Sequence, residues 1–312
     1  MVGLNNLPPK LSVIMTVYNG EAFLQETLDA VWAQTFTNFE LVVLNNGCTD
    51  DTQVILDAVE DKRLRVIQAP QHGTFGDGIR LAYQNARGEY IAVQDADDVS
   101  LPDRFEKQVA TFDADHSLGL VFGAYQDMDE HGCLAAIHCP PSQGQALIGA
   151  FQTHNPLAHS TYMYRRVASD QVGGYPIEYA YGPDFGLVIR LIKKGWAVKV
   201  LDDVILKLRL HAGQTSILPM FSVTRAHDAL YLFREAATID GVTPQARRAG
   251  RRHIAKCTLQ YALALLGEGD LRKGMRQMLM GLLRNPIYGL AYLGYRLGVL
   301  LKWIKPIGQR SS

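Results

Sequence analysis

The chain has 312 residues, 47% of them hydrophobic, and its 31 basic residues balance 31 acidic residues. A chain of this length and composition can bury one substantial core plus a smaller appendage, which excludes a largely disordered protein. Cysteines without metal-type spacing and an N-terminus without an apolar signal segment favour a reduced, cytoplasmic setting; the cysteines are Cys48, Cys133, Cys139 and Cys257.

Apolar runs alternate with helical patterns along the first hundred residues. The predicted strands cover residues 11–17, 39–44, 64–67 and 90–94. The predicted helices between them cover residues 21–33, 51–59 and 76–86. This order is typical of an α/β protein with a Rossmann-like, mostly parallel sheet and helices on both faces. Because parallel strands end at a common edge, residues 16–19, 45–47 and 95–97 should meet there and bind a ligand.

Three carboxylates, Asp95, Asp97 and Asp98, follow the fourth predicted strand. Mg²⁺ and Mn²⁺ prefer carboxylate oxygens and usually share their coordination with substrate phosphates, so this group could hold a nucleotide diphosphate. The alternative is a solvated loop, with Asp98 or Ser100 capping a helix that starts near Pro102. The residues alone leave both interpretations open.

Two further candidate side chains lie downstream. Asp184 opens a predicted helix, where a carboxylate could act as a general base or could only complement the helix N-terminus. His211 follows a predicted strand at residues 204–210; a neutral imidazole could bind a metal ion, a charged one could bind phosphate, and a structural role is also open. His154 and His159 could border an acceptor cleft, although ordinary loop positions explain them equally well.

The even balance of charge conceals an asymmetry between two parts of the chain. Residues 241–312 hold 13 Lys and Arg against two acidic residues, a net charge of +11, so the remainder carries −11. Leucines and aromatic residues lie between these basic residues, which suits an anionic membrane surface better than nucleic acid. Arg284, Pro286 and Arg296 interrupt the apolar stretch, so it should lie on a bilayer and not cross it. A helical hairpin that packs on protein is the alternative.

Several segments form an ordered set of motifs. They are Ser12–Gly20, Gln34–Leu41, Asn45–Asp50, Gly88–Asp98, Gly173–Tyr175, Asp184 with Arg190, Leu191 and Gly195, and His211–Ser216. Together they resemble family 2 of the inverting glycosyltransferases, of the bacterial polysaccharide-biosynthesis type, over about the first 216 residues. The resemblance implies the A-type glycosyltransferase fold at residues 1–220, with a donor-binding half at about 1–100 and an acceptor half at about 101–220. Residues 221–312 would then form a basic, amphipathic helical appendage.

The resemblance also implies a reaction. It is the metal-dependent transfer of a sugar, with inversion, from a nucleotide-diphosphate sugar to a saccharide or lipid-linked saccharide in the synthesis of surface polysaccharide or glycoconjugate. A uridine diphosphate sugar is the first donor expected, and Mg²⁺ or Mn²⁺ the metal. The expected location is the cytoplasm or the inner face of the cell membrane, with no nucleic-acid partner.

Site residues carry over from the family by position. Asp184 would be the catalytic base, and the metal ligands would be Asp97, Asp95 and His211. The implied donor-binding residues are Thr16, Val17, Tyr18, Asn19, Asn46, Asp77, Arg80, Asp95 and Ala96.

Two departures from the family pattern affect these expectations. Asn45 and Asn46 stand where the family usually has paired aspartates. Asn46 can still accept a hydrogen bond from a uracil ring N–H, but it also offers an amide donor, so another base is possible. Pro183 stands where the family commonly has glutamate. These departures suggest an alternative, a catalytically silent nucleotide-sugar-binding or scaffold protein with the same fold.

Overall fold

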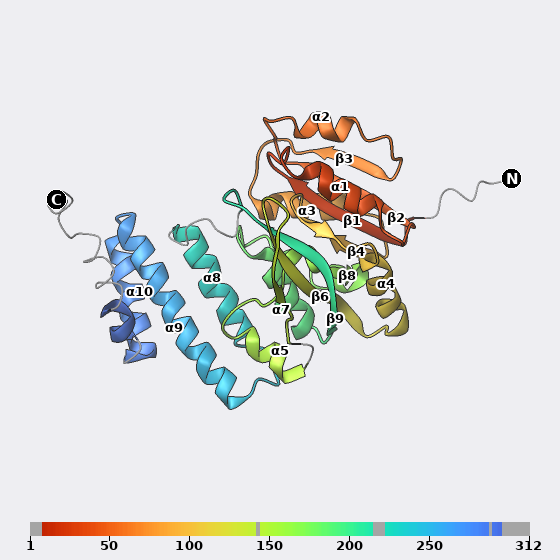
Figure 1. Ribbon diagram of the computed structural model, residues 1–312. Coiled ribbons are helices and arrows are strands. Elements are labelled where there is room, and N and C mark those ends of the chain that lie inside the picture. Colours follow the sequence, from red (N-terminus) through yellow and green to blue (C-terminus); the bar gives the residue numbers. More distant parts are fainter. Residues whose placement is uncertain (1–7, 142–143, 215–221, 287–288, 295–312) are drawn as a thin grey trace, which may run out of the picture.

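The computed structural model of the chain describes residues 8–141, 144–214, 222–286 and 289–294. In this part, nine strands form one mixed sheet in the order β3-β2-β1-β4-β8-β6-β9-β5, and β7 pairs with β6 outside that path (Figure 1). The strands are β1 (Leu11–Val17), β2 (Phe39–Asn45), β3 (Leu64–Gln68), β4 (Tyr90–Val93), β5 (Val99–Ser100), β6 (Leu118–Asp129), β7 (Leu134–His138), β8 (Met163–Arg165) and β9 (Ala197–Leu210). The helices are α1 (Leu24–Trp32), α2 (Thr52–Asp57), α3 (Phe75–Asn85), α4 (Arg104–Ala114), α5 (Gly144–Ala150), the 3₁₀ turn η1 (His159–Thr161), α6 (Arg166–Asp170), α7 (Pro183–Lys193), α8 (Val223–Ala236), α9 (Pro244–Gly267) and α10 (Leu271–Arg284).

The first four strands confirm the predicted parallel sheet. β1 pairs in parallel with β2 and with β4, and β2 pairs in parallel with β3. Each of these strands begins and ends within one residue of its predicted bounds. β1 and β2 are buried on both faces, which explains why their sequences are continuous apolar runs without alternation.

Helices cover both faces of the sheet, as predicted. Val13 of β1 shares one hydrophobic core with Leu28 of α1 and Phe105 of α4. Ile14, the next residue of β1, points to the other face and shares a second core with Ile79 of α3 and Leu187 of α7. Because successive side chains of a strand point to opposite faces, one apolar strand contributes to both cores.

The later strands bring the chain back to the end of β4. β8 is antiparallel to both β4 and β6, and β6 runs parallel to the long strand β9. The two-residue strand β5 pairs with β9, with Val99 opposite Lys207. The loop at residues 94–98 is therefore held between β4 and the end of β9, close to His211.

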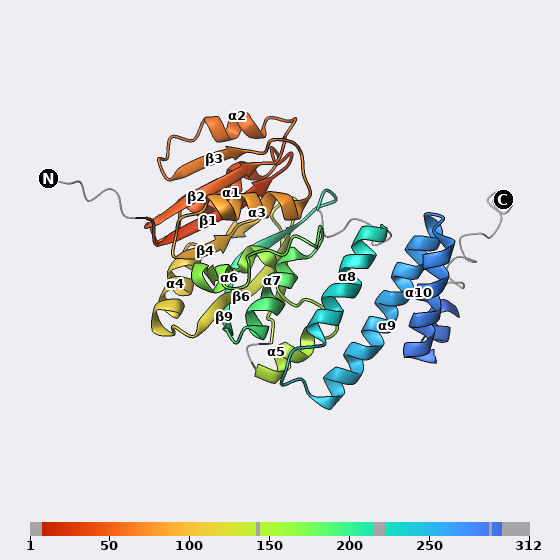
Figure 2. The same cartoon turned by 180° about the vertical axis from the view of Figure 1, so that it is seen from behind.

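A layered helical region follows the sheet. Figures 1 and 2 show α9 between α8 and α10, with α10 at the edge of the molecule away from β3. Leu232 and Ala236 of α8 join the core that α3 and α7 share, so α8 is packed into the main body. Across the described ranges, every helix is too short or too polar to cross a membrane. The predicted helical appendage is present over the part of residues 221–312 that the structure describes.

The predicted cap of the helix after the carboxylates is wrong. Helix α4 begins at Arg104, with Asp103 at the N-cap position. Ser100 instead donates its hydroxyl hydrogen to Gln94 Oε1, at 2.5 Å. Asp98 accepts a hydrogen bond from the backbone N–H of Arg209 at 2.8 Å. Both side chains are buried and satisfy interior polar groups, so neither is available to the helix N-terminus.

Gly88 lies at the entry to β4, where the structure leaves no room for a side chain. A Cβ atom at Gly88 would lie 2.4 Å from the backbone nitrogen of Ser12. We therefore expect Gly88→Ala to lower the free energy of unfolding, measured by urea denaturation, by about 3 kcal/mol. Gly267→Ala is the control, because no heavy atom lies within 4 Å of its Cβ position, and it should stabilise the protein by up to about 1 kcal/mol. An unchanged unfolding midpoint for Gly88→Ala would contradict this account.

Candidate active site

The ends of β1 and β2 meet at one edge of the sheet, as the sequence predicted. The backbone N–H of Asn46 donates to the carbonyl of Val17 at 2.9 Å. Asn19 has a φ of 51°, a left-handed conformation that asparagine tolerates, and its Oδ1 accepts from the Thr49 N–H at 2.8 Å. The Gly20 N–H donates to Thr52 Oγ1 at 2.8 Å. These bonds tie the loop after β1 to the loop after β2 and hold an open edge where a ligand can lie.

An aromatic pair borders this edge. The ring of Tyr18, which is 52% exposed, lies 4.2 Å from the ring of His72 between centroids. His72 Nδ1 is 2.8 Å from the Asn46 carbonyl oxygen, which can only accept, so Nδ1 carries the proton. The Asn46 side chain pairs with the backbone of Gly73 through both of its ends, at 3.0 and 3.1 Å. The two rings are tilted by 40° to each other and lie beside Asn46, and sequence reasoning missed His72.

Three of the predicted donor-binding residues line this edge mainly through their backbone. Val17 is 2% exposed, so its side chain belongs to the core. Thr16 Oγ1 is buried and has no hydrogen-bond partner among the described residues, and a Cβ on Gly78 would lie 2.5 Å from it. The Ala96 carbonyl accepts from Thr27 Oγ1 at 3.1 Å, which ties the carboxylate loop to α1.

Asp77 and Arg80 engage in local contacts of α3. Asp77 forms a capping box with Thr74, in which the Asp77 N–H donates to Thr74 Oγ1 and the Asp77 carboxylate accepts from the Thr74 N–H. Arg80 pairs with Asp77 at 2.5 Å and donates to the Pro176 carbonyl at 3.1 Å. Both side chains therefore stabilise the start of α3 and its contact with the segment before α7. Their predicted contact with a donor stays a prediction.

Asp97 and His211 are brought together from distant parts of the chain. Asp97 Oδ2 lies 2.9 Å from His211 Nε2. The ring of His211 in turn lies 4.9 Å from the ring of Phe23 between centroids. The structure therefore brings together two of the three side chains that were predicted as metal ligands, Asp97 after β4 and His211 after β9.

Like charges crowd this group of carboxylates. Removal from water raises the pKa of Asp95 well above its usual value, and the neighbouring charges of Asp98, Asp97 and Asp184 raise it further. Burial, followed by the charge of Asp97, raises the pKa of Asp98 to about 7. A bound cation would relieve this repulsion, because an opposite charge favours the ionised form of a carboxylate. The pKa shifts thus mark the place where positive charge is needed.

The geometry fits a metal ion that shares its coordination with a ligand. Among the residues that the structure describes, no three His, Cys, Asp or Glu side chains form a ready metal cage. The Asp97 and His211 pair offers one carboxylate oxygen and one imidazole nitrogen at one place. Mg²⁺ is typically bound by one or two carboxylates, with phosphates and waters completing its shell, and Mn²⁺ accepts oxygen ligands as well. Two protein ligands would therefore suffice if a phosphate group bound beside them.

A buried arginine that sequence reasoning missed lies beneath the carboxylates. Arg104, at the start of α4, is fully buried. Its Nη1 donates to Gln94 Oε1 at 3.1 Å and to Ser100 Oγ at 2.8 Å, and its Nη2 donates to the Val93 carbonyl at 2.7 Å. Burial lowers the pKa of Arg104 to about 9, while the charges of Asp98 and Asp95 oppose that shift. Its guanidinium joins β4 and β5 and balances part of the acidic charge above it.

A second buried arginine reaches the same loop from β9. Arg209 is 1% exposed, and its Nε donates to the Asp97 carbonyl at 2.9 Å. Its Nη2 pairs with Glu26 of α1, and its guanidinium lies 4.6 Å from the ring centroid of Phe23. The backbone N–H of Arg209 donates to Asp98, which also accepts from Ser160 of η1. Asp98 is thus a structural anchor of the loop. In sequence, Arg209 looks like an ordinary polar residue of a strand.

Asp184 lies in the first turn of α7, as predicted, and faces the same carboxylates. Its charge helps to raise the pKa of Asp95, so the two carboxylates lie near each other. Asp184 Oδ2 accepts from Asn155 Nδ2 at 3.3 Å. Gly182, with a φ of 76°, precedes the helix, and Pro183 occupies its first turn. Proline is favoured there, so the missing glutamate is compatible with a normal helix start.

The segment that leads into Asp184 is held by α8. Asp228 of α8 is 2% exposed, and its Oδ2 accepts from the backbone N–H groups of Ala180 and Tyr181, each at 3.0 Å. Tyr179 donates its hydroxyl to Glu235 of α8, also at 3.0 Å. Two acidic side chains of the C-terminal region therefore position the backbone just before Asp184. Sequence reasoning missed both, because a single acidic residue on a helix carries no distinguishing pattern.

His159, but not His154, lies beside Asp184. His159 Nε2 is 2.9 Å from the hydroxyl of Tyr175, and its Nδ1 is buried with no partner in the described part of the chain. Burial lowers the pKa of His159 to about 4, although the charge of Asp184 opposes that shift. The imidazole is therefore neutral at physiological pH and borders the cleft as a polar, uncharged wall. His154 is exposed and contacts Thr153.

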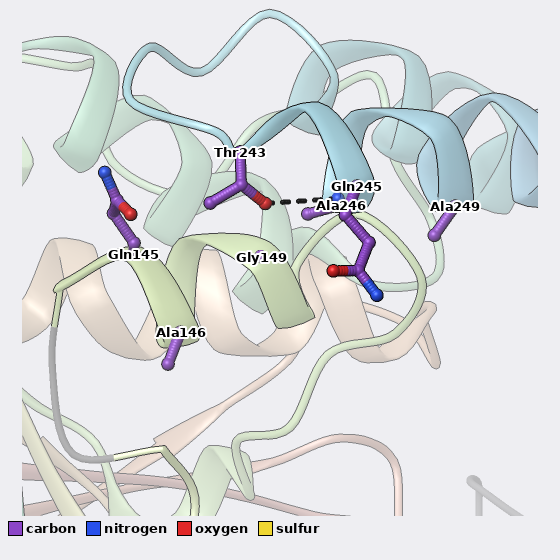
Figure 3. Close-up of a pocket in the computed structure, with 7 residues that line it drawn as sticks. All are labelled: Gln145, Ala146, Gly149, Thr243, Gln245, Ala246 and Ala249. Atoms are coloured by element: carbon purple, nitrogen blue, oxygen red, sulfur yellow. Dashed lines mark hydrogen bonds between the residues drawn. The ribbon is translucent and has the colours of Figure 1, made fainter.

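Two surface hollows lie away from this edge. One, of about 280 Å³, is bordered by Val172 and by basic residues at the end of α7. The other, of about 380 Å³, lies between α5 and the start of α9 (Figure 3). Its lining residues are Gln145, Ala146, Gly149, Thr243, Gln245, Ala246 and Ala249. Neither hollow is lined by a carboxylate.

Comparison with known sequences agrees with this geometry. The profile described as Glycosyl transferase family 2 matches residues 12–170, about half of the chain. EpsE of Bacillus subtilis, named as a glycosyltransferase, is 31% identical over 211 residues, which span 65% of this chain and 74% of EpsE. An uncharacterized glycosyltransferase of Haemophilus influenzae is 28% identical over 241 residues, which span 75% of this chain and 88% of that protein.

Solved structures show the same fold. Residues 1–349 of TarS from S. aureus, in complex with UDP-GlcNAc, align with a TM-score of 0.68 at 19% identity, covering 93% of this chain and 92% of that one. The mannosyltransferase PcManGT from Pyrobaculum calidifontis, in complex with GDP-Man and Mn²⁺, aligns with a TM-score of 0.57 at 17% identity, covering 96% and 82%. These similarities confirm the predicted A-type glycosyltransferase fold.

The buried Arg104 allows a direct test of how the carboxylates are held in place. Arg104→Leu removes several interior hydrogen bonds and leaves Asp98 without its buried counter-charge, so the free energy of unfolding should fall by about 3–5 kcal/mol. The matched control is Arg248→Leu on the exposed face of α9, which should change it by less than about 0.5 kcal/mol. Urea denaturation measures both variants. A loss of under about 1 kcal/mol for Arg104→Leu would show that this arginine does not anchor the loop.

Proposed function

The chain belongs to glycosyl transferase family 2 and is a glycosyltransferase, and from this we propose that it catalyses inverting transfer from a nucleotide-diphosphate sugar. The acceptor would be a saccharide or lipid-linked saccharide, and the product a surface polysaccharide or glycoconjugate. Mg²⁺ or Mn²⁺ would be required. In this proposal residues 1–100 form the donor-binding half and residues 101–220 the acceptor half of the catalytic domain.

One observation carries the proposal. Asp95, Asp97, Asp184 and His211 come from three separate segments and converge on the edge where β1 and β2 end. An inverting transfer needs a place for a charged leaving group and one base on the opposite side of the reacting carbon. Asp97 and His211 could hold a cation that stabilises the leaving group, and Asp184 is a separate carboxylate that could act as the base.

The donor would lie along the edge between Tyr18 and the carboxylate loop. The Tyr18 and His72 rings could stack on the base. Asn46 Oδ1 accepts a hydrogen bond from the Gly73 N–H and, within the described part of the chain, from no other donor, so its second lone pair could accept from a base N–H. A uridine diphosphate sugar is therefore the first donor to test. A guanosine diphosphate sugar is the second. Of the two proteins that share the fold, TarS is described with UDP-GlcNAc and PcManGT with GDP-Man.

Asp97 and His211 would hold the metal ion, and Asp95 would support it through water or bind the ribose. When bound, the ion would neutralise charge on the diphosphate as the sugar leaves. The raised pKa of Asp95 supports this arrangement, because a nearby cation would allow the carboxylate to ionise.

Asp184 would accept the proton of the acceptor hydroxyl. Asn155 and the start of α7 orient its carboxylate, and α8 positions the segment before it. The neutral His159 beside it would border the acceptor without adding a second charge. We further propose that the basic C-terminal region brings this cleft to acceptors on the inner face of the cell membrane. Thr215 and Ser216 of the His211 motif, and the tail residues 295–312, lie outside the described residues.

Metal removal tests the proposal directly. Many such transferases slowly cleave their donor with water, so nucleotide sugars can be screened for release of nucleoside diphosphate with Mg²⁺, with Mn²⁺ and with EDTA. We expect release with one metal and none with EDTA. Asp97→Ala should weaken donor binding, measured by calorimetry with Mn²⁺, by at least about tenfold. Asp57→Ala, at an exposed position on α2, is the matched control and should bind normally. Donor binding without any release would favour the silent scaffold instead.

Asp184→Asn separates chemistry from binding. The amide keeps the shape of the carboxylate but cannot accept the proton, so kcat should fall by about 10²–10⁴ while the donor Kd stays within about twofold. Donor turnover and calorimetry on the same preparation measure the two quantities. Turnover equal to that of the unmodified protein would overturn Asp184 as the base.

A further inference from the structure

Helix α10 is the outermost of the three C-terminal helices and shows one face to solvent. In Figures 1 and 2 it lies beyond α9, at the edge of the molecule away from β3. Its inner face carries Gly274 and Gly281, where a Cβ would lie 2.6 Å from Leu266 and 2.7 Å from Leu259 of α9. Such close approach sets the rotation of α10 on α9, so the opposite face must point outward.

A stripe of large apolar side chains runs along the exposed side of α10. Large apolar side chains recur at every fourth position and are 58–72% exposed: Leu271, Met275, Leu279 and Leu283. Leu290, in the helical residues 289–294, is 64% exposed. The core-facing side of this helix is already packed, so these residues form a second apolar stripe. A surface helix that faces only water has polar residues at these positions.

Basic residues flank the stripe. Arg272, Lys273, Arg276 and Arg284 of α10 are exposed, and residues 271–284 contain no acidic residue. Burial, followed by the charge of Arg234 of α8, lowers the pKa of Arg284. The exposed side of α10 therefore carries positive charge beside the apolar stripe.

We propose that this face of α10 is a docking surface for an anionic phospholipid bilayer. The leucine stripe would enter the boundary between headgroups and acyl chains, and the flanking exposed arginines of α10 would contact lipid phosphates. The proposal deepens the proposed function, on which it rests for its purpose, by naming the surface that brings the cleft to a lipid-linked acceptor. The docking itself can be measured without any turnover.

The charges favour lipid over a second copy of the chain. Two copies that paired through this stripe would bring Arg272, Arg276 and Arg284 of each copy together with no acidic partner on α10, and like charges at close range are destabilising. An anionic bilayer supplies the missing opposite charge. A nucleic acid would also supply it, but it would leave Leu279 and Leu283 in water.

Vesicle co-sedimentation of the full chain tests the proposal. The chain should pellet with phosphatidylcholine vesicles that contain phosphatidylglycerol, should stay in solution with pure phosphatidylcholine, and should bind less as salt increases. Leu279→Glu with Leu283→Glu should lower the partition coefficient about tenfold per leucine. Arg272→Gln with Arg276→Gln should lower it about fivefold per arginine.

Matched controls keep each outcome informative. Val54→Glu, at an apolar position on α2 that is 65% exposed, should pellet like the unmodified chain. All variants should keep donor hydrolysis, which shows that they fold and separates loss of docking from failure of the proposed function. Undiminished pelleting of Leu279→Glu with Leu283→Glu would overturn the proposal. So would a chain that hydrolyses donor and stays in solution with phosphatidylglycerol. If the unmodified chain formed a dimer and bound no vesicles, and Leu279→Glu with Leu283→Glu abolished that dimer, the stripe would be assigned to self-association.

Discussion

Repulsion among the carboxylates after β4 is the constraint around which this part of the fold is arranged. Burial, and then the charges of Asp98, Asp97 and Asp184, raise the pKa of Asp95, while burial and the charge of Asp97 raise the pKa of Asp98. Two buried arginines, Arg104 and Arg209, hold this group of carboxylates in place. Arg104 balances the group through β4 and β5, and Arg209 holds the loop backbone from β9. The remaining deficit of positive charge faces the open edge, where a cation with a diphosphate could neutralise it.

The sequence predicted the donor half of the fold closely and the rest only in part. Strands β1 to β4 were recognisable because burial on both faces requires continuous apolar runs, and the helix that Asp184 opens was predicted where α7 begins. The pairing of β6, β8 and β9 depends on contacts between distant segments that no local pattern records. The same reason explains the site: Asp97, Asp184 and His211 belong to motifs, whereas Arg104, His72 and Asp228 acquire their places only through tertiary contacts. Capping by Asp98 failed as a prediction because a buried partner on β9 competes for its oxygens.

Helix α8 links the C-terminal region to the candidate base more tightly than a mobile appendage would. Asp228 accepts two backbone hydrogen bonds from the segment before Gly182. Glu235 accepts a hydrogen bond from the hydroxyl of Tyr179 in the same segment. A Cβ on Gly182 would lie 2.8 Å from Leu232, so the left-handed turn at Gly182 also packs directly on α8. These contacts lie beyond residues 12–170, the range that the family profile matches. The segment just before Asp184 is therefore held by a helix that lies outside the range matched by the family profile.

This linkage has a consequence for how the protein would act at a membrane. Helix α10 packs on α9 through glycines, α9 packs on α8, and α8 packs into the core that carries α7 and Asp184. If the outward face of α10 lies on a bilayer, no flexible linker in residues 222–286 separates it from the cleft. The distance and angle between cleft and membrane would then be set by helix packing. A lipid-linked acceptor would meet Asp184 in one fixed orientation, which favours one hydroxyl over its neighbours because a base acts only within hydrogen-bond reach. The basic tail would on this argument contribute to acceptor selection as well as to location.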